Sequence, residues 1–309
     1  MHGSKRLWRS LSLLLLSLLI GCGTVPSEVP AVQAPTPQPA ISAAPVAEEE
    51  TVLVRSEPEE TPIPTPTPTA SPTPSPSPTP EPEHSTAAML DEGLFDSYFD
   101  DALLIGDSLV WILTNYVRGM RQKTEGYLGE AQFMGTVSMS VKNASTNKAY
   151  PGSITFTYHN KAVSVTEGIQ RSGAKKAFIM LGLNDIGFRN WDDVQGYFAT
   201  LIEVIQTECP ETEIVMMGIL PVTSSYCKKN SVKISRWNSF NEILSGICEA
   251  HSVDFLNFAD LLKNDDGYLK TAYASGDFHL NEDGEAIWIR SLRAYAAAKL
   301  HPDATVDYP

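Results

Sequence analysis

Short apolar runs alternate with longer amphipathic stretches through residues 102–300. An uninterrupted apolar run is typical of a buried parallel strand, whereas apolar residues spaced three and four apart indicate one face of a helix. The predicted strands are 102–105, 131–135, 176–181, 213–218 and 253–256. The predicted helices are 109–123, 164–171, 191–207, 231–250 and 281–300. This alternation predicts a single three-layer α/β/α domain with a mostly parallel sheet, whose ligands bind at the carboxyl ends of the strands.

Two further patterns in this region lead to expectations about packing. Residues 136–162 are polar and hairpin-like, with Asn143, Asn147 and Pro151-Gly152 as breakers. Trp111, Trp191 and Trp237 stand at helical spacing, which favours a place in the core over a role in stacking on sugars.

The N-terminus has the pattern of a targeting segment. Basic residues precede an apolar stretch at 11–20, which is too short to span a bilayer. Leu19-Ile20-Gly21-Cys22 resembles the bacterial lipobox, which implies a signal peptide over 1–21, cleavage before Cys22 and lipidation of its thiol. An ordinary signal peptide with a chance cysteine is the alternative. Acylation of Cys22 would anchor the protein to the outer face of the bacterial cell membrane.

Residues 22–83 differ in composition from the domain at 84–309 that follows. They contain Pro-Thr-Ser repeats, which cannot bury apolar surface and favour an extended polyproline II chain. At about 3.1 Å per residue, this tether would reach roughly 190 Å. That length suits carrying a domain away from a membrane.

Charge and cysteine content narrow the range of partners. The net charge of −14 divides into +3 for the signal, −8 for the tether and −9 for the domain. An acidic domain without basic clusters argues against nucleic acid and fits neutral polymers or small esters better. The spacing of Cys209, Cys227 and Cys248 indicates neither a zinc site nor a disulfide framework, although one disulfide is allowed.

The first candidate for chemistry is Gly106-Asp107-Ser108-Leu109, which follows the strand predicted at 102–105. Ser108 would lie where a strand turns into a helix, so its hydroxyl would be exposed at the sheet edge beside a helix N-terminus. Such a position stabilises a negative charge that develops on a substrate oxygen. Taken alone, the same four residues also fit a turn with an N-capping serine.

Three further candidates follow predicted strands or precede the last helix. Gly135 ends the strand at 131–135, where the lack of a Cβ lets the backbone N–H face a ligand. Asn184, in Gly182-Leu183-Asn184-Asp185, can donate a hydrogen bond to an oxyanion or cap a turn. His279 precedes the helix at 281–300, and histidine is the usual base for a serine nucleophile.

Together these blocks resemble the GDSL/SGNH hydrolase superfamily, with Ser108, Gly135, Asn184 and His279 as the four residues that name it. The resemblance covers the chain from about residue 94 and implies a flavodoxin-like SGNH-hydrolase fold. It also implies that Ser108 is the nucleophile and His279 the base. The backbone N–H groups of Ser108 and Gly135 and the side chain of Asn184 would form the oxyanion hole. No metal or organic cofactor is required by this chemistry.

The last block departs from the family pattern Asp-x-x-His. Gly276 stands three residues before His279, and Asp277 stands only two before it. Asp277 is the candidate for the third triad residue if the loop is rearranged. A backbone carbonyl or Asp283 is the alternative partner of the imidazole.

These observations predict a lipid-anchored, extracytoplasmic serine esterase that removes acyl groups from carbohydrate or cell-wall glycans, with acetyl as the expected acyl group. Two alternatives use the same sequence features. A cell-wall O-acyltransferase would employ the same residues while excluding water. A non-catalytic wall-binding lipoprotein would retain the fold, and the position of Asp277 is the feature that favours it.

Overall fold

The computed structural model describes residues 86–149, 152–187 and 190–302. The predicted signal peptide, Cys22 and the predicted tether up to residue 83 lie outside the described residues. Within the described ranges, none of the helices combines the length and the hydropathy that crossing a membrane requires.

Five parallel strands form the central sheet in the order β2-β1-β5-β6-β7. Their bounds are β1 Ala102–Gly106, β2 Gln132–Gly135, β5 Lys176–Met180, β6 Glu213–Met217 and β7 Asp254–Leu256. Gly106 is in register with both Gly135 and Met180, so three neighbouring strands end at the same edge. The predicted strands and the parallel α/β sheet are confirmed.

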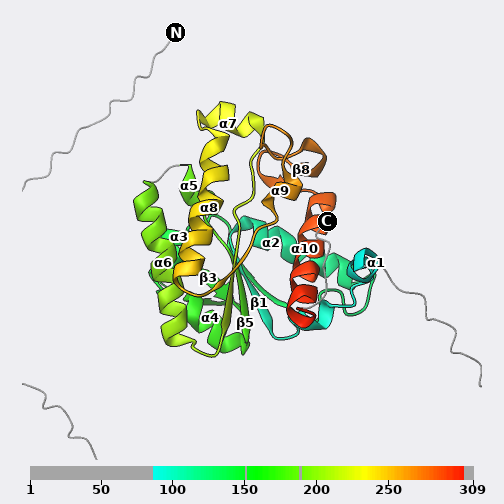
Figure 1. Cartoon of the computed structure of the whole chain (residues 1–309). Helices are drawn as coiled ribbons and strands as arrows, with labels where there is room; N and C mark the ends of the chain where they lie inside the picture. Colours follow the sequence, from blue (N-terminus) through cyan, green and yellow to red (C-terminus); the bar gives the residue numbers. More distant parts are fainter. Residues whose placement is uncertain (1–85, 150–151, 188–189, 303–309) are drawn as a thin grey trace, which may run out of the picture. The chain divides into compact units, whose positions relative to one another are not determined.

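Helices cover both faces of this sheet, with α4, α6 and α8 packed together on one face and α2 and α10 on the other (Figure 1). Their bounds are α2 Ser108–Arg121, α4 Val165–Ser172, α6 Trp191–Glu208, α8 Ile234–Ala250 and α10 Glu282–Leu300. The start of α4 shows why such a prediction succeeds. Ser164 and Glu167 form a reciprocal capping box, which is a signal contained in the sequence itself.

Shorter elements connect these layers. The short helices are α1 Thr86–Asp91, η1 Asp96–Phe99, α3 Val141–Ser145, α5 Leu183–Ile186, α7 Ser224–Asn230, α9 Ala259–Leu262 and η2 Thr271–Tyr273. The short strands are β3 Phe156–Tyr158, β4 Lys161–Val163, β8 Ala274–Ser275 and β9 His279–Leu280, and they form the antiparallel hairpins β3–β4 and β8–β9.

Two predictions of secondary structure need correction. The hairpin expected over 136–162 is present only in β3–β4, because residues 141–145 form α3 and pack against α6. The single helix expected over 231–250 begins only at Ile234. Ser231 has a left-handed φ of 55°, which ends α7 and separates it from α8.

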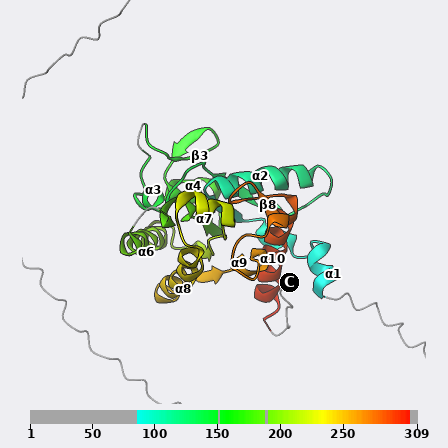
Figure 2. The ribbon, with the colours of Figure 1, turned by 90° about the horizontal axis from the view of Figure 1, so that it is seen from above.

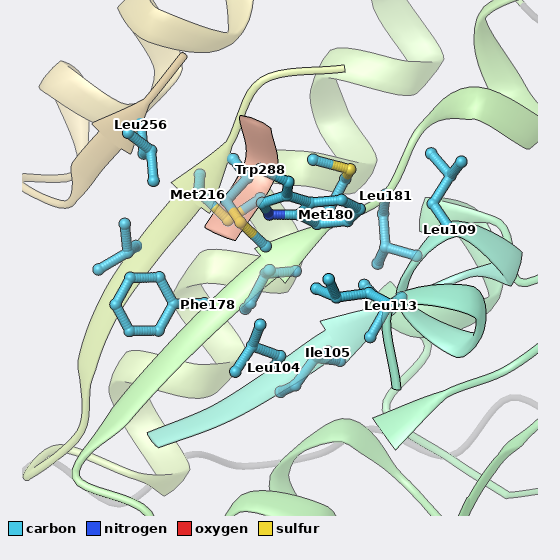
Figure 3. Packing of buried hydrophobic residues seen from close by; sticks show 14 of the residues in the cluster. Leu104, Ile105, Leu109, Leu113, Phe178, Met180, Leu181, Met216, Leu256 and Trp288 are labelled. Atoms are coloured by element: carbon cyan, nitrogen blue, oxygen red, sulfur yellow. The ribbon is translucent and has the colours of Figure 1, made fainter. Parts of the chain in front are cut away.

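The core lies on both sides of the sheet and includes residues of β1, β5, β6, α2 and α10 (Figure 3). Trp237 is 1 % exposed, as predicted for a core residue. Trp111 is expected in the core but is 50 % exposed, whereas its neighbours Val110 and Leu113 on α2 are buried. Cys209, Cys227 and Cys248 are buried free thiols, so the disulfide that the sequence allowed does not form among them.

Candidate active site

Ser108 is the first residue of α2, directly after the carboxyl end of β1. Gly106 is required at the end of β1, since a Cβ there would lie 2.4 Å from the carbonyl oxygen of Met180. Asp107 then caps the helix, its Oδ1 accepting a hydrogen bond from the N–H of Leu109 at 2.9 Å. The sharp strand-to-helix turn predicted from the sequence is therefore built from a close backbone contact and a buried N-cap.

The structure brings His279 to this serine from 171 positions further along the chain. Ser108 Oγ and His279 Nε2 lie 3.0 Å apart, within hydrogen-bond distance. His279 begins β9, the second strand of the hairpin β8–β9, where it is paired with Ser275. The neighbouring Phe278 packs edge-on against Tyr226, which fixes this hairpin to α7. The arrangement places a base in contact with a hydroxyl, as nucleophilic catalysis requires.

Gly135 lies beside the first turn of α2. A Cβ at this position would come within 2.4 Å of the backbone nitrogen of Trp111 and 2.7 Å of its Cα. The N–H of the next residue, Thr136, donates to the carbonyl oxygen of Gly106 at 3.0 Å. Glycine is therefore needed for β2 to end against the helix that carries Ser108.

Asn184 lies in α5, which follows β5 through Gly182. Gly182 has a φ of +115°, a conformation that side chains other than glycine rarely adopt. The Asn184 amide donates one hydrogen bond to Asp107 Oδ2 at 3.1 Å and one to the carbonyl oxygen of Met139 at 3.0 Å. Asn184 is thus held next to the residue that precedes the candidate nucleophile.

Asp277 is placed differently from the other candidates. It lies in the loop between β8 and β9, and its Oδ1 accepts a hydrogen bond from the hydroxyl of Thr223 at 3.4 Å. Its Oδ2 lies 4.0 Å from Lys229 Nζ. Within the described part of the chain, no hydrogen bond joins His279 Nδ1 to this carboxylate or to that of Asp283, which is exposed on α10. The contacts therefore join Ser108 and His279 but leave Asp277 apart from them.

The comparison with family models shows to which family this chain belongs. The model of the GDSL-like Lipase/Acylhydrolase family matches residues 104–287, a range that includes Ser108, Gly135, Asn184 and His279. The chain belongs to this family. It is accordingly an ester hydrolase, and the resemblance inferred from the sequence is confirmed at the level of the family and the enzyme class.

Solved structures of the family share the fold at low sequence identity. A protein of Bacteroides fragilis NCTC 9343 described as an acylhydrolase matches with a TM-score of 0.51 and 12 % identity, covering 64 % of this chain and 87 % of its own. A GDSL-like lipase of Bacteroides thetaiotaomicron VPI-5482 matches with a TM-score of 0.50 and 12 % identity, covering 70 % and 99 %. A search of curated protein sequences finds no significant match.

Burial changes the electrostatics of two groups in the site. Burial lowers the pKa of His279 below its ordinary value of 6.5, so its imidazole is neutral and able to accept a proton at pH 7. Burial also raises the pKa of Asp107 to about 7, and the nearby charge of Asp185 contributes to the increase. The hydrogen bonds from Leu109 and Asn184 favour the ionised form of Asp107 and oppose this increase.

Two positioning residues were not singled out by sequence reasoning, although both stand inside the motifs. Asp107 joins the N-terminus of α2 to the Asn184 amide. Asp185 is fully buried, and its Oδ2 accepts a hydrogen bond from the N–H of Val141 at 2.8 Å, which holds the start of α3. An acidic residue directly beside each polar candidate was the available signal. Among the described residues, no group of three or more His, Cys, Asp or Glu side chains is placed to hold a metal ion.

Proposed function

We propose that this family member is a serine esterase that removes O-acyl groups, principally O-acetyl, from carbohydrate through an acyl-serine intermediate. The observation that carries the mechanism is the 3.0 Å contact between Ser108 Oγ and His279 Nε2 at the carboxyl edge of the sheet. The position of Ser108 at a helix N-terminus supports the same assignment, because partial positive charge at that end favours a developing oxyanion.

In the first half of the reaction, Ser108 Oγ attacks the ester carbonyl carbon while His279 Nε2 takes the hydroxyl proton. The carbonyl oxygen becomes an oxyanion, for which the backbone N–H groups of Ser108 and Gly135 and the Asn184 amide are the proposed donors. One such donor is typically worth about 2.7–4 kcal/mol of transition-state stabilisation. Asn184 can supply its hydrogen bond by releasing the one it donates to Met139.

In the second half, the tetrahedral intermediate expels the sugar oxygen, which takes the proton from His279 Nε2 and leaves as an alcohol. The acyl group remains on Ser108 Oγ. A water molecule then attacks the acyl carbon while His279 again accepts a proton, and Ser108 leaves with that proton as the free acid is released. Each proton that His279 accepts is returned, so the cycle needs no co-reactant other than water.

A carbohydrate substrate is supported by the surface beside Ser108. Trp111 stands three residues after Ser108 on the same face of α2, and a helical side chain leans toward the N-terminus of its helix. Its indole is 50 % exposed, and Val137, two residues after Gly135, is 57 % exposed. An exposed indole presents a flat apolar face together with a polar N–H, which suits the alternating C–H and hydroxyl groups of a sugar ring.

The proposed substrate is tested by measuring acetate release from acetylated xylan and from O-acetylated peptidoglycan. We expect time-dependent release from at least one of the two polymers and faster release from the more neutral polymer, xylan. A protein that hydrolyses p-nitrophenyl acetate but releases acetate from neither polymer would contradict the carbohydrate assignment. Transfer of acetyl to an added sugar without formation of free acetate would instead indicate the acyltransferase.

The contacts of Asp277 lead to a quantitative expectation for the triad. Replacing an aspartate that orients a catalytic histidine by asparagine lowers kcat about 10,000-fold. Because the Asp277 carboxylate contacts Thr223 rather than His279, we expect Asp277→Asn to lower kcat on p-nitrophenyl acetate by less than about tenfold. Asp283→Asn serves as the parallel variant on the exposed face of α10. A loss of a thousandfold or more in Asp277→Asn alone would show that this carboxylate reaches His279 during turnover.

We also propose that lipidation of Cys22 anchors the enzyme to the outer face of the bacterial membrane, with residues 22–83 as the tether. The lipobox-like sequence before Cys22 supports this proposal. In a bacterial host, most of the wild-type protein is expected in the membrane fraction, whereas Cys22→Ala is expected to lose that association. Fractionation followed by immunoblotting measures the difference. An unchanged distribution in Cys22→Ala would exclude the lipid anchor.

A further inference from the structure

A cavity of about 610 Å³ lies beside the hairpin that carries His279. Its walls come from the start of α7, from residues 264–272 and from the hairpin residues Ala274, Gly276 and Asp277. We call this cavity the hairpin groove. The elements α7 and β8 lie side by side in both views of the molecule (Figures 1 and 2). Its volume is within the range of small-molecule sites, so it can hold more than a single water-sized group.

The hairpin β8–β9 connects the groove to the base that contacts Ser108. Asp277, on its wall, stands two residues before His279, which corresponds to roughly 7 Å of extended chain. His279 in turn lies 3.0 Å from Ser108. The groove therefore adjoins the hairpin that carries His279, although neither His279 nor Ser108 is among its lining residues.

The lining of the groove has the chemistry of a site for hydroxyl groups. Ser224, Ser225 and Thr271 contribute short hydroxyl side chains, and one cation, Lys270, is balanced by one anion, Asp277. Such a balance gives little attraction for a strongly charged ligand. Hydroxyl groups, which both donate and accept hydrogen bonds, instead match a neutral, polyhydroxylated molecule.

Two side chains of the groove are oriented by the protein yet keep hydrogen-bonding capacity. Asn264 Oδ1 accepts hydrogen bonds from the backbone N–H groups of Asp266 and Tyr268, which orients its amide. Its Nδ2 donates to no atom in the described part of the chain. Among the described residues, the Asp277 carboxylate accepts one long hydrogen bond, from Thr223 at 3.4 Å, and its Oδ2 lies 4.0 Å from the exposed Lys229 Nζ, so it keeps lone pairs that can accept from a ligand hydroxyl.

We propose that the hairpin groove is a binding subsite for the neutral sugar chain on either side of the acylated unit, with Asn264 and Asp277 as hydrogen-bonding partners of its hydroxyl groups. This proposal rests on the proposed carbohydrate esterase function. The proposal also gives Asp277, the sequence-predicted candidate for the third triad residue, a different role. In this subsite Asp277 binds sugar, and it stands next to the base without orienting it.

The test measures binding without turnover, in the full chain carrying Ser108→Ala. Isothermal titration calorimetry compares acetylated xylohexaose with the single-unit probe acetylated xylose. We expect the hexamer to bind at least tenfold more tightly than the single unit. Adding Ser225→Trp, which fills the groove, is expected to abolish most of that advantage. Ser245→Trp is the matched control, an exposed serine of α8 outside the groove, and it should leave the advantage intact.

Asp277→Asn, which preserves the size of the side chain, provides a second variant and should weaken hexamer binding several-fold. Equal affinities for the two probes would overturn the subsite, and so would an unchanged hexamer affinity in both groove variants. Tighter binding of an acidic peptidoglycan fragment than of acetylated xylohexaose would contradict the proposed preference of the groove for a neutral sugar chain. Failure of the proposed carbohydrate esterase function is distinguished by a different measurement. In that case the wild-type enzyme releases no acetate from either polymer, whereas binding of the hexamer in the groove can still be detected by calorimetry.

Discussion

Ser108→Ala is expected to lower kcat on p-nitrophenyl acetate by at least about 10,000-fold, because loss of a serine nucleophile removes the covalent route entirely. The residual rate would come from the oxyanion donors and from binding alone. The fold should be unaffected, since Asp107 rather than Ser108 supplies the cap of α2. The measurement is initial-rate hydrolysis together with a thermal melt of both proteins.

The matched control for this variant is Ser245→Ala, at an exposed serine of α8 that lies far from Ser108 in the sequence and has no role in the proposed chemistry. It is expected to keep the wild-type rate. If Ser108→Ala retained the wild-type rate, the nucleophile would lie elsewhere. If the wild type and Ser108→Ala were equally inert, the assignment of Ser108 as a nucleophile would lose its support.

His279→Ala is expected to lower kcat by a similar factor, about 10,000-fold or more, since the base and nucleophile of such a pair act as one unit. Ser108 Oγ has His279 Nε2 as its hydrogen-bond partner, so the variant leaves the hydroxyl without a proton acceptor. Combining both substitutions should cost little more than either alone. His251→Ala, in the turn after α8, is the control and should remain fully active.

The pH dependence gives an independent readout of the same residue. The imidazole must be neutral to accept a proton, so activity falls as the pH drops through the pKa of His279. Burial lowers that pKa, and the wild-type acid limb of kcat/KM is therefore expected below pH 6.5. The residual activity of His279→Ala should lack this limb. An acid limb well above pH 6.5 in the wild type would contradict the burial argument.

The main elements of the fold were predictable because their stability is encoded locally. Apolar runs such as 176–181 have the length and composition of buried strands, and the cap at Ser164 is visible in the sequence. Helix α3 was not predictable in this way. It has only five residues, and its first N–H is bonded to Asp185, which is 44 positions away. Periodicity within so short a helix carries little information.

Trp111 shows a second limit of local patterns. A tryptophan at helical spacing has the same sequence signal whether its face of the helix meets the sheet or the solvent. The burial of Trp237 and the exposure of Trp111 follow from how α8 and α2 are rotated against the rest of the domain. That rotation is set by packing between layers, which one helix does not specify.

The sequence by itself determined the order of the central strands and the long helices, the family, and the four residues that the family motifs place at strand ends or before the last helix. These follow from hydrophobic periodicity and from short motifs, which are properties of neighbouring residues. The tertiary structure alone decided which candidates meet. It joined Ser108 to His279 at 3.0 Å and turned the Asp277 carboxylate toward Thr223. The physical reason is that each contact depends on where the hairpin β8–β9 packs against α2 and α7, elements far from it in the chain.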